Sequence, residues 1–477
     1  MAESLPAPMV AALQQLGQAL TQWGQTHRDA PLATHEQGVL EVVRAVLPTL
    51  LGAVLQASTT ALAPAQQRVR APCPTCGTRR EARHQWRKRT VRTVCGPIRY
   101  ERPRYRCRPC HQEWSPADHT LGVAPRARLS AGLDEWLADL GVATAFAPAA
   151  GLLERLTGLR VSAETVRQHS EQQGAALDAA QQAAIAQVQA TGEAAEVVEA
   201  APGTLVIEAD GVLVRYRRSE WHEVKVGLVA GGVDGRLLAP SYVAAREEAT
   251  VFGPRLLTEA ARRGALAVVR WEGARTGAGL AVLRRVVVLG DGAPWIWNLA
   301  AEHFGERVEI LDFYHASQHL WALAQALHGA GTAAATAWAT PRLHTLRQAG
   351  GEALLRTLRW LRPTTAEAKE ALRRERNYFR TNRTRLAYPT YAEQGLPIGS
   401  GAVESAAKHL VQRRLKRPGA RWSPAGAQAI LTLSAYRASR PTRSTRSGEH
   451  RRQAEAAAAR RQAAAQTEAA GAEPRVA

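Results

Sequence analysis

The spacing of apolar residues between Gly203 and Phe313 predicts a series of strands and helices. Three runs of β-branched and apolar residues come first and read GTLVIEADGVLVRYR, SEWHEVKVGLVAGGV and RLLAPSYVAARE. Short turns separate these runs, which is typical of consecutive strands. The helical segment TVFGPRLLTEAARRG follows, and then the strand RRVVVLGD, the helix PWIWNLAAEHF and the strand RVEILDF. The pattern therefore predicts the order β-β-β-α-β-α-β.

This order of elements predicts an α/β fold with a mixed sheet. We expect the first, fourth and fifth strands to form a parallel core with an antiparallel flank, which is the ribonuclease H-like arrangement. The first and fourth strands are neighbours in that arrangement. Asp210 and Asp291, at the ends of these two strands, would therefore meet. Residues 316–396 are almost wholly helical in pattern, which predicts a helical insertion before the last part of the core.

The N-terminal part of the chain has a different pattern. Residues 1–67 are rich in Ala, Leu and Gln and predict helices, including an apolar helix, EVVRAVLPTLLGAVLQA, that Pro48 interrupts. We interpret this region as a packing or self-association element. A short, basic and aromatic segment with β-prone character follows it, from Arg68 to about Leu121.

Four of the five cysteines lie at the two ends of that segment as Cys-x-x-Cys pairs. Cys73 and Cys76 form the first pair, and Cys107 and Cys110 form the second. Four thiolates in two such pairs complete a tetrahedral site for a structural Zn²⁺ ion, so the spacing predicts a zinc ribbon. The alternative is four unrelated buried thiols. Cys95 has no partner in this pattern.

Residues 128–175 predict a helix, LSAGLDEWLADLG, followed by two helices joined by a tight link at Gly158 to Val161. A separate helix rich in Gln and Ala, ALDAAQQAAIAQVQA, is expected after them. Ser162 is placed to cap the second of the two linked helices, and Thr165 and Val166 would pack inward. Arg167 and Gln168 would then lie on the exposed face, as in a helix-turn-helix that reads DNA. The alternative is an ordinary pair of packed helices, which has the same pattern.

Three acidic residues stand in settings that suit metal ligands. Asp210 and Asp291 each end an apolar strand and precede a glycine, and Glu404 lies in the helical segment IGSGAVESAAKHLVQRRLK. Three such carboxylates predict a site for two Mg²⁺ (or Mn²⁺) ions that acts on phosphodiesters. One ion would activate a water or a 3′-hydroxyl, and the other would stabilise the leaving oxygen. For each Asp-Gly pair, a simple turn is the alternative.

Two further groups of residues accompany these carboxylates. Asp312 and His315 are three residues apart at a predicted strand-to-helix junction, where His315 could hold a phosphate or transfer a proton. The alternative is that Asp312 only caps the helix. After Glu404 the segment is basic, which predicts either a phosphate-binding stripe or a solvated basic face. The expected DNA contacts there are Lys408, Arg413, Arg414, Lys416 and Arg421.

The charge balance agrees with a polyanionic partner. The chain has 62 Lys and Arg against 42 Asp and Glu, which gives a net charge of +20, and 45% of its residues are hydrophobic. Such a chain can bury cores and also bind nucleic acid. The sequence shows neither a signal peptide nor an apolar run of membrane-spanning length, so we expect a cytoplasmic protein without a membrane partner.

Several blocks of sequence closely resemble the insertion-sequence transposases of the ISKra type, within the wider group of DDE transposases. The blocks are CPTCG, YRCRPC, EADG, WHEVKVG, LGDGAPWIWN, LDFYHASQHL, GLPIGSGAVES and RRLKRPGARWS, and they span roughly residues 72–435. Ala420 departs from the pattern, where a Met is expected, and the tail lacks the family's tryptophan-containing ending.

The resemblance implies a DNA transposase that cuts element ends and joins the 3′-hydroxyl to target DNA with Mg²⁺. Asp210, Asp291 and Glu404 would be its catalytic triad, and Asp312 with His315 would match the Asp-x-x-His signature of Mutator-like relatives. Its partners would be the inverted ends of the element and target DNA, and the active complex would be a homo-oligomer. The alternatives are a catalytically silent DNA-binding regulator derived from a transposase and a structure-selective nuclease on the same fold.

Together these inferences predict seven divisions of the chain. They are an N-terminal helical region (1–67), a zinc ribbon (68–125), a helical region with the helix-turn-helix (126–200), the first part of a ribonuclease H-like catalytic core (201–315), a helical insertion (316–396), the rest of the core with the glutamate helix (397–438) and a basic, disordered tail (439–477).

Overall fold

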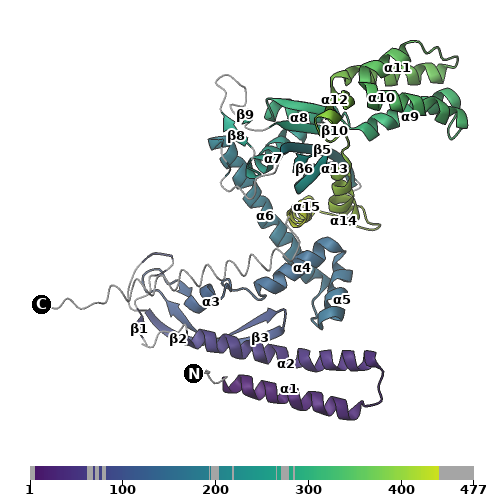
Figure 1. The fold of residues 1–477 in the computed structure, drawn as a ribbon. Coiled ribbons are helices and arrows are strands. Elements are labelled where there is room, and N and C mark those ends of the chain that lie inside the picture. Colours follow the sequence, from purple (N-terminus) through teal and green to yellow (C-terminus); the bar gives the residue numbers. More distant parts are fainter. Residues whose placement is uncertain are drawn as a thin grey trace. The chain divides into compact units, whose positions relative to one another are not determined.

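The computed structural model of the 477-residue chain is a mixed α/β structure (Figure 1). The structure describes residues 6–61, 68–69, 73, 75–77, 82–192, 194, 203–216, 220–264, 266–269, 279–282 and 285–439. The chain divides into two compact units, Met1–Gln172 and Gln173–Ala477. The division falls inside one long helix, α6 (Ala163–Thr191), where the sequence pattern predicted two separate helices. The predicted basic tail from residue 440 onward lies outside the described residues.

Unit 1 begins with a helical hairpin. It consists of α1 (Ala7–Thr26) and α2 (Leu32–Ala61). The expected interruption at Pro48 is wrong, because α2 continues through this residue. A proline in a helix removes one backbone hydrogen bond, but here its ring packs so closely on Gly96 that a Cβ at Gly96 would lie 2.8 Å from it. The expectation of no membrane-length helix also needs correction. By length and composition alone, Leu32–Thr60 is the one helical segment among the described residues that could cross a membrane.

A small antiparallel sheet follows the hairpin. Its strands, in spatial order, are β1 (Arg68–Val69), β2 (Ala82–Thr93), β3 (Gly96–Arg106) and β4 (Glu113–Trp114). The short helix α3 (Pro116–Thr120) places the buried carboxylate of Asp118 beside the sheet. Asp118 accepts hydrogen bonds from Arg89 at 2.5 Å, Tyr100 at 3.0 Å and Arg102 at 2.9 Å. These two arginines of the basic segment therefore hold the ribbon together.

The rest of unit 1 is helical. After α4 (Ala131–Ala143) and α5 (Phe146–Thr157), the chain turns at Gly158, whose φ of 75° is left-handed, and enters α6. The predicted cap is present, since the Ser162 hydroxyl accepts a hydrogen bond from the Thr165 backbone N–H at 3.0 Å. Val166 is completely buried in the core that α4 and α5 share. The Ser162 cap and the inward packing of Val166 expected from the sequence are therefore present, as they would be in either a helix-turn-helix or an ordinary pair of packed helices.

Unit 2 is built on a five-stranded mixed sheet. The strand order is β11-β10-β5-β6-β7, with parallel pairs β11/β10 and β10/β5 and antiparallel pairs β5/β6 and β6/β7. The predicted first, fourth and fifth strands are β5, β10 and β11, and they form the expected parallel core. The strand bounds are β5 (Thr204–Arg215), β6 (Trp221–Val233), β7 (Arg236–Ala245), β10 (Val286–Gly290) and β11 (Arg307–Leu311). A separate hairpin, β8 (Leu266–Val269) with β9 (Gly279–Val282), was not predicted.

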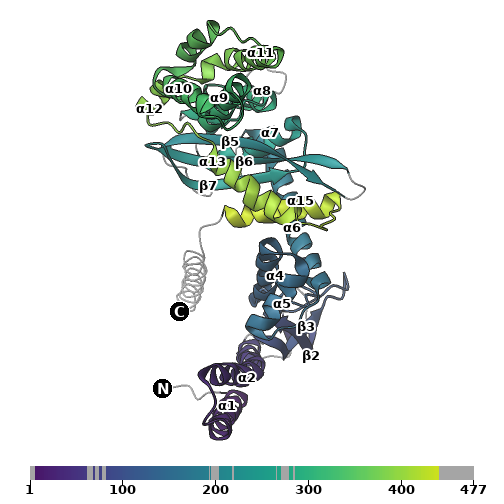
Figure 2. The ribbon, with the colours of Figure 1, turned by 90° about the vertical axis from the view of Figure 1, so that its right-hand side faces the viewer.

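Helices cover both faces of this sheet (Figure 2). On one face lie α7 (Ala249–Arg262) and α8 (Pro294–His303), which share the main apolar core with β5, β10 and β11. On the other face lie α13 (Gly401–Ala406) and α15 (Pro424–Ala438), which contact β5 and β7 respectively. The predicted helical insertion contains α9 (Phe313–His328), α10 (Ala333–Arg359), α11 (Ala366–Thr381), a 3₁₀ turn (Arg383–Arg385) and α12 (Tyr388–Glu393).

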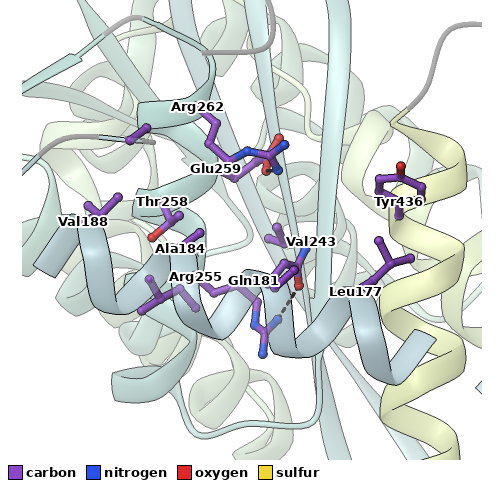
Figure 3. Close-up of a pocket in the computed structure, with 13 residues that line it drawn as sticks. Leu177, Gln181, Ala184, Val188, Val243, Arg255, Thr258, Glu259, Arg262 and Tyr436 are labelled. Carbon is purple, nitrogen blue, oxygen red and sulfur yellow. Dashed lines mark hydrogen bonds and ion pairs between the residues drawn. The ribbon is translucent and has the colours of Figure 1, made fainter. Parts of the chain in front are cut away.

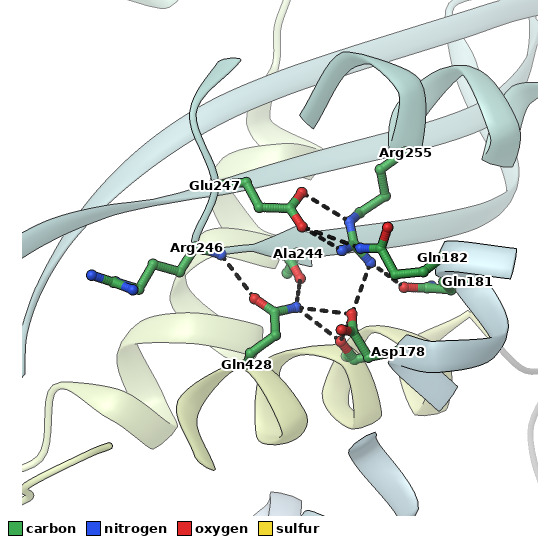
Figure 4. Close-up of polar contacts among 9 residues, drawn as sticks. Asp178, Gln181, Gln182, Ala244, Arg246, Glu247, Arg255 and Gln428 are labelled. Carbon is green, nitrogen blue, oxygen red and sulfur yellow. Dashed lines mark hydrogen bonds and ion pairs between the residues drawn. The ribbon is translucent and has the colours of Figure 1, made fainter. Parts of the chain in front are cut away.

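The part of α6 that belongs to unit 2 is fixed by a buried arginine. The Arg255 side chain, 1% exposed, donates hydrogen bonds to Gln181 at 2.5 Å, Asp178 at 3.1 Å and Glu247 at 2.6 Å (Figure 4). These partners pair with the guanidinium, so it is not left as an uncompensated buried charge. Beside it is a mainly apolar pocket of about 210 Å³, lined from α6, α7, β7 and α15 (Figure 3). Because the Arg255 guanidinium is already paired with Asp178, Gln181 and Glu247, it leaves no unpaired positive charge in this pocket.

Candidate active site

The four cysteines of the two Cys-x-x-Cys pairs come together in unit 1. Their sulfur atoms all lie within 4.8 Å of one another, and the closest contacts are Cys73 to Cys110 at 3.5 Å and Cys76 to Cys107 at 3.6 Å. The first pair is shaped by Gly77, whose φ of 67° is left-handed and whose N–H bonds the Cys73 carbonyl at 2.9 Å. Four convergent thiols fit a structural Zn²⁺ ion. Cys95 lies outside the cluster, as expected.

In unit 2, three aspartates lie on or directly after three neighbouring parallel strands. Asp291 and Asp312 follow β10 and β11, but Asp210 does not end its strand as expected, because β5 continues to Arg215 and Asp210 lies just past the part of β5 that pairs with β10. The β5/β10 register pairs Glu208 with Leu289, and the β10/β11 register pairs Gly290 with Leu311. Extending both registers by one or two residues places Asp210, Asp291 and Asp312 level with one another. Side chains at the carboxyl ends of parallel strands gather at one edge of a sheet, which is where open α/β sheets bind ligands.

Asp210, the first aspartate of this row, has a pKa raised to about 6, with burial as the largest cause. The hydrogen bond from the Gly211 N–H opposes this rise in pKa, and the carboxylates of Asp291, Glu404 and Glu223 add to it. The Gly211 N–H donates to Oδ1 of Asp210 at 2.7 Å. Negative charges that act on one another in this way mark the place where a cation would be stabilised. Residues far apart in the sequence, at 210, 291 and 404, therefore form one electrostatic site.

Asp291 begins the loop between β10 and α8. Its Oδ1 accepts the Ala293 N–H at 2.8 Å, which closes a tight turn around Gly292. Gly292 has a φ of 102°, and a Cβ there would lie 3.0–3.1 Å from Leu311 and from the Tyr378 hydroxyl. Only glycine fits this conformation and this space without strain. The turn expected for Asp-Gly is therefore present, and it orients the Asp291 carboxylate as well.

The Tyr378 hydroxyl holds this loop from the helical insertion. It donates to the Asp291 backbone carbonyl at 3.1 Å, and burial, followed by the nearby Asp291, Asp312 and Glu375 carboxylates, raises the pKa of Tyr378. The Tyr378 ring stacks on His319 at 3.6 Å, and Nδ1 of His319 contacts Oε2 of Glu375 at 2.7 Å. Although burial alone would raise the pKa of Glu375, its hydrogen bonds with His319 and Arg374 keep it below its usual value. The insertion thus supports a strand-end aspartate directly.

Glu404 lies in the first turn of α13, and its side chain is exposed. Two acidic residues of the sheet hold the start of this helix. Oε2 of Glu208 accepts the Val403 N–H at 2.9 Å, and Oδ2 of Asp312 accepts both the N–H and the hydroxyl of Ser400. The helix that carries Glu404 is therefore attached to β5 and to the end of β11 by two carboxylate side chains that accept hydrogen bonds from its first residues.

The Asp312 side chain is 1% exposed, and both of its carboxylate oxygens accept hydrogen bonds within the protein. Its Oδ1 accepts the His315 N–H at 2.5 Å, which caps α9, and its Oδ2 holds Ser400. The capping alternative for Asp312 describes these contacts well. His315 is half-buried, and its ring meets that of His319 edge to face at 5.1 Å. His315 thus belongs to the His319 and Tyr378 group beside the Asp291 loop.

Glu208 is a member of the site that the sequence analysis did not single out. It is completely buried, and burial raises the pKa of Glu208 to about 8, against the hydrogen bond from Val403, with the charges of Asp312 and Glu404 adding to the effect. Its Oε1 has no hydrogen-bond partner among the described residues. The sequence did contain a signal for this role. Glu208 is a charged residue in an otherwise apolar strand, and because it is two residues before Asp210, both side chains lie on the same face of the sheet.

A further charged pair borders Asp210 on the neighbouring strand β6. Lys225 and Glu223 form an ion pair at 2.7 Å, and the buried Lys225 ammonium lies 5.0 Å from the centre of the Trp295 ring. The Glu223 carboxylate covers Gly211 so closely that a Cβ at this glycine would meet it at 2.0 Å. Trp295 therefore packs on a buried cation.

The basic segment after Glu404 differs in two respects from the prediction. Residues Ala407–Gln412 form a π-helix, so the expected spacing of 3.6 residues per turn does not apply there. Arg414 is 4% exposed, and its guanidinium lies 4.7 Å from the centre of the Trp422 ring, so it is not at the surface that could contact DNA. The other expected contacts in this segment are exposed, and they are Lys408, Arg413, Lys416 and Arg421.

The two expected DNA-reading residues of α6 are engaged within their own helix. Arg167 donates to Glu164 at 2.6 Å and to Glu171 at 2.5 Å, and Gln168 donates to Glu164 at 2.7 Å. Arg167 is partly exposed, so the pairing neutralises its charge but does not bury it. To contact DNA, Arg167 and Gln168 would have to break their hydrogen bonds to Glu164 and Glu171 and form new ones to bases or phosphates.

Comparison with known families gives one match. Residues 75–246 are similar to the model of an uncharacterised protein family, UPF0236, which spans just over a third of the chain. The matched region contains Cys76, Cys107, Cys110 and Asp210, and it ends before Asp291 and Glu404. No curated protein matches the chain.

Proposed function

We propose that the chain is a DNA transposase that cuts DNA at the ends of an insertion sequence and joins them to a target. The observation that carries the proposal is the convergence of Asp210, Asp291 and Glu404. Their charges meet at the edge of a mixed sheet, and Asp291 and Glu404 help to raise the pKa of Asp210 to about 6. Three carboxylates on two adjacent strands and a later helix match the DDE triad that the resemblance implies.

The mixed sheet supports the finer assignment of a ribonuclease H-like catalytic core. Its parallel strands β5 and β10 carry the two aspartates, and α13 brings the glutamate to the face of β5 that bears Glu208. The helical insertion stands between the second and third triad members, where it supports the Asp291 loop through Tyr378. An insertion at this position belongs to the architecture that the resemblance implies.

The donor set fits Mg²⁺ or Mn²⁺. Carboxylate oxygens are the ligands that these ions prefer, and Asp210, Asp291 and Glu404 would hold two ions. When bound, such ions activate an attacking oxygen and stabilise the leaving oxygen of a phosphodiester. Around them, the Gly211 and Ala293 N–H groups orient the two aspartates.

Positive charge supports DNA as the substrate. The net charge is +20, and the exposed Lys408, Arg413, Lys416 and Arg421 follow Glu404 directly. Such side chains contact phosphates without reading sequence. The ribbon and the α5–α6 pair would supply end recognition in unit 1.

The test uses labelled DNA that carries the inverted ends flanking this gene. The full chain is incubated with this DNA in Mg²⁺, in Mn²⁺ and in EDTA, and both strand breaks and joined products are measured. We expect metal-dependent breaks at the ends, followed by joining. Asp210→Asn, Asp291→Asn and Glu404→Gln should each abolish both reactions and leave end binding within about twofold, because phosphate contacts come from Lys and Arg.

The matched control is Asp234→Asn, the same chemical change at an exposed turn of unit 2, which should retain activity. Cleavage that survives in all three triad variants would contradict the proposal. Breaks without joined products would identify a nuclease. Tight end binding without breaks in either metal would identify a regulator.

A further inference from the structure

The α1–α2 hairpin differs in charge from the rest of this strongly basic chain. Residues Ala7–Thr26 of α1 contain no charged side chain, and the 30 residues of α2 contain three, Glu36, Glu41 and Arg44, apart from His35. The whole chain carries a net charge of +20. Two copies would therefore repel each other over most of their surface, and the hairpin is a region where they can approach without that penalty.

One side of the hairpin is already occupied by the ribbon. Gln56 accepts the Glu101 N–H at 2.7 Å, and the Thr59 hydroxyl donates to the Glu101 carbonyl at 2.9 Å. Arg44 donates to the Leu156 carbonyl at 2.6 Å. These polar contacts fall inside the apolar stretch Leu32–Thr60, and a helix that makes them cannot be surrounded by lipid. The hairpin is therefore a fixed part of unit 1.

The remaining face of the hairpin exposes large apolar side chains. In α2, Leu32 is 74% exposed, Val39 is 40% exposed and Val54 is 44% exposed. Leu32 and Val39 are seven residues apart, which places them on one face of the helix. In α1, Val10 and Leu13 lie three residues apart and are 38% and 43% exposed. Both helices of the hairpin thus leave an apolar stripe uncovered.

The size of this surface suits a stable dimer. At a rise of about 1.5 Å per residue and a diameter of about 10 Å, one face of helices of 20 and 30 residues covers roughly 750 Å². A stable protein interface uses about 800 Å² on each partner. A second hairpin of the same kind would cover this face and complete a four-helix bundle, in which apolar stripes face one another.

We infer that α1 and α2 form a homodimer interface with the same hairpin of a second copy of this chain. The inference does not depend on the proposed function, because it rests on exposure and charge in unit 1. It assigns to the N-terminal hairpin the self-association that the sequence pattern suggested.

The test measures the mass of the full chain by light scattering during gel filtration. The wild type should have twice the monomer mass of 51.6 kDa, and Val39→Arg should weaken dimerisation at least tenfold, because it places a charge in the apolar face. The matched control is Gln37→Arg, which adds the same charge on the opposite side of α2 at an exposed position. This control should remain dimeric.

A second measurement covers the case in which Val39→Arg fails to fold, which loss of bound zinc would reveal. Hydrogen exchange of the wild type is followed at high concentration and after dilution until the mass halves. Exchange in α1 and α2 should rise on dilution, with little change in unit 2. A monomeric wild type, or a Val39→Arg protein that folds and dimerises normally, would overturn the inference. Sedimentation of the wild type with phosphatidylcholine vesicles, lost in Val39→Arg, would assign the face to a membrane and overturn it too.

Discussion

The ribbon of unit 1 and the sheet edge of unit 2 hold their candidate metal ligands differently. The four sulfur atoms lie within 4.8 Å of one another, and among the described residues no other group of three or more Cys, His, Asp or Glu side chains does so. Asp210, Asp291 and Glu404 are near enough for charge to raise the pKa of Asp210, yet they do not close into such a group. The cysteine site is therefore closed by its four ligands, whereas the carboxylate site is open.

The difference follows from what holds each ligand. Each cysteine pair is local in sequence and shaped by its own turn, and the β2–β3 hairpin between the two pairs brings them together. The carboxylates repel one another, and separate groups hold them in place, among them the Ala293 N–H for Asp291 and Glu208 for the helix of Glu404. A closed site suits a structural ion, whereas an open site leaves positions for a substrate.

The largest expected effect comes from breaking the closed site. Cys73→Ser should release about one zinc per chain and unfold the ribbon, because a structural zinc site contributes on the order of 10 kcal/mol to folding. End binding should weaken with it. Zinc content by mass spectrometry and thermal unfolding of unit 1 would measure this. Cys95→Ser is the control, because Cys95 lies outside the cluster. Full zinc retention in Cys73→Ser would show that the cluster does not bind zinc.

The next effect concerns the buried acid of the open site. Folding raises the pKa of Glu208 to about 8, so the folded state favours its protonated form. This stability is fully present below the unfolded pKa of about 4.3 and is lost as the pH rises through about 8. The loss should be roughly 3–5 kcal/mol in the free energy of unfolding.

Urea unfolding of the full chain at pH 5, 7 and 9 would measure this loss. Glu208→Gln should flatten the pH dependence, because an amide cannot ionise and still accepts the Val403 N–H. The exposed Glu352→Gln is the control and should follow the wild type. An unchanged slope in Glu208→Gln would assign the pH dependence to other groups.

Added Mg²⁺ should have a smaller effect on the open site. Burial is the main cause of the raised pKa of Asp210, and a cation would relieve the additional part that comes from neighbouring carboxylates. At ten times its dissociation constant, Mg²⁺ would stabilise unit 2 by about 1.4 kcal/mol. Thermal unfolding with and without Mg²⁺ would measure the shift. Asp210→Asn should abolish it, and Asp234→Asn should retain it. An equal shift in both variants would mean that Mg²⁺ binds elsewhere.

The smallest expected effect tests the support of Asp291 by the insertion. Tyr378→Phe removes only the hydroxyl that donates to the Asp291 carbonyl, which should cost about 1 kcal/mol of unfolding free energy. Tyr314→Phe is the control, because this side chain is 64% exposed and a surface change costs less than about 0.5 kcal/mol. Equal losses in the two variants would show that the hydroxyl does not stabilise the loop.

Periodicity and spacing predicted much of this structure. The strand pattern predicted the parallel core of β5, β10 and β11, and the Cys-x-x-Cys spacing predicted the cysteine cluster. These features are local, or they follow from rules of strand connection. The continuous α6 was not predicted, because Gly174 reads as a helix breaker. In the structure, that glycine lets α6 approach α15, since a Cβ there would lie 2.0 Å from the Ala429 carbonyl oxygen.

What the sequence could not predict depends on packing between distant residues. The burial of Arg414 on Trp422 has no local signal in a segment rich in arginine. The π-helix after Glu404 likewise has no local signal in the sequence, and it contacts β5. The use of Asp312 to hold Ser400 became visible only when the end of β11 and the start of α13 were placed side by side.

The order of the carboxylates along the chain has a consequence during synthesis. At about 5–20 residues per second, a ribosome needs roughly 10–40 s to proceed from residue 210 to residue 404. Throughout that interval the nascent protein contains the four cysteines and the α5–α6 segment but lacks Glu404. Under the proposed function, a chain released early would occupy element ends without cutting them. Premature termination before α13 would therefore yield an inhibitor of the full-length protein.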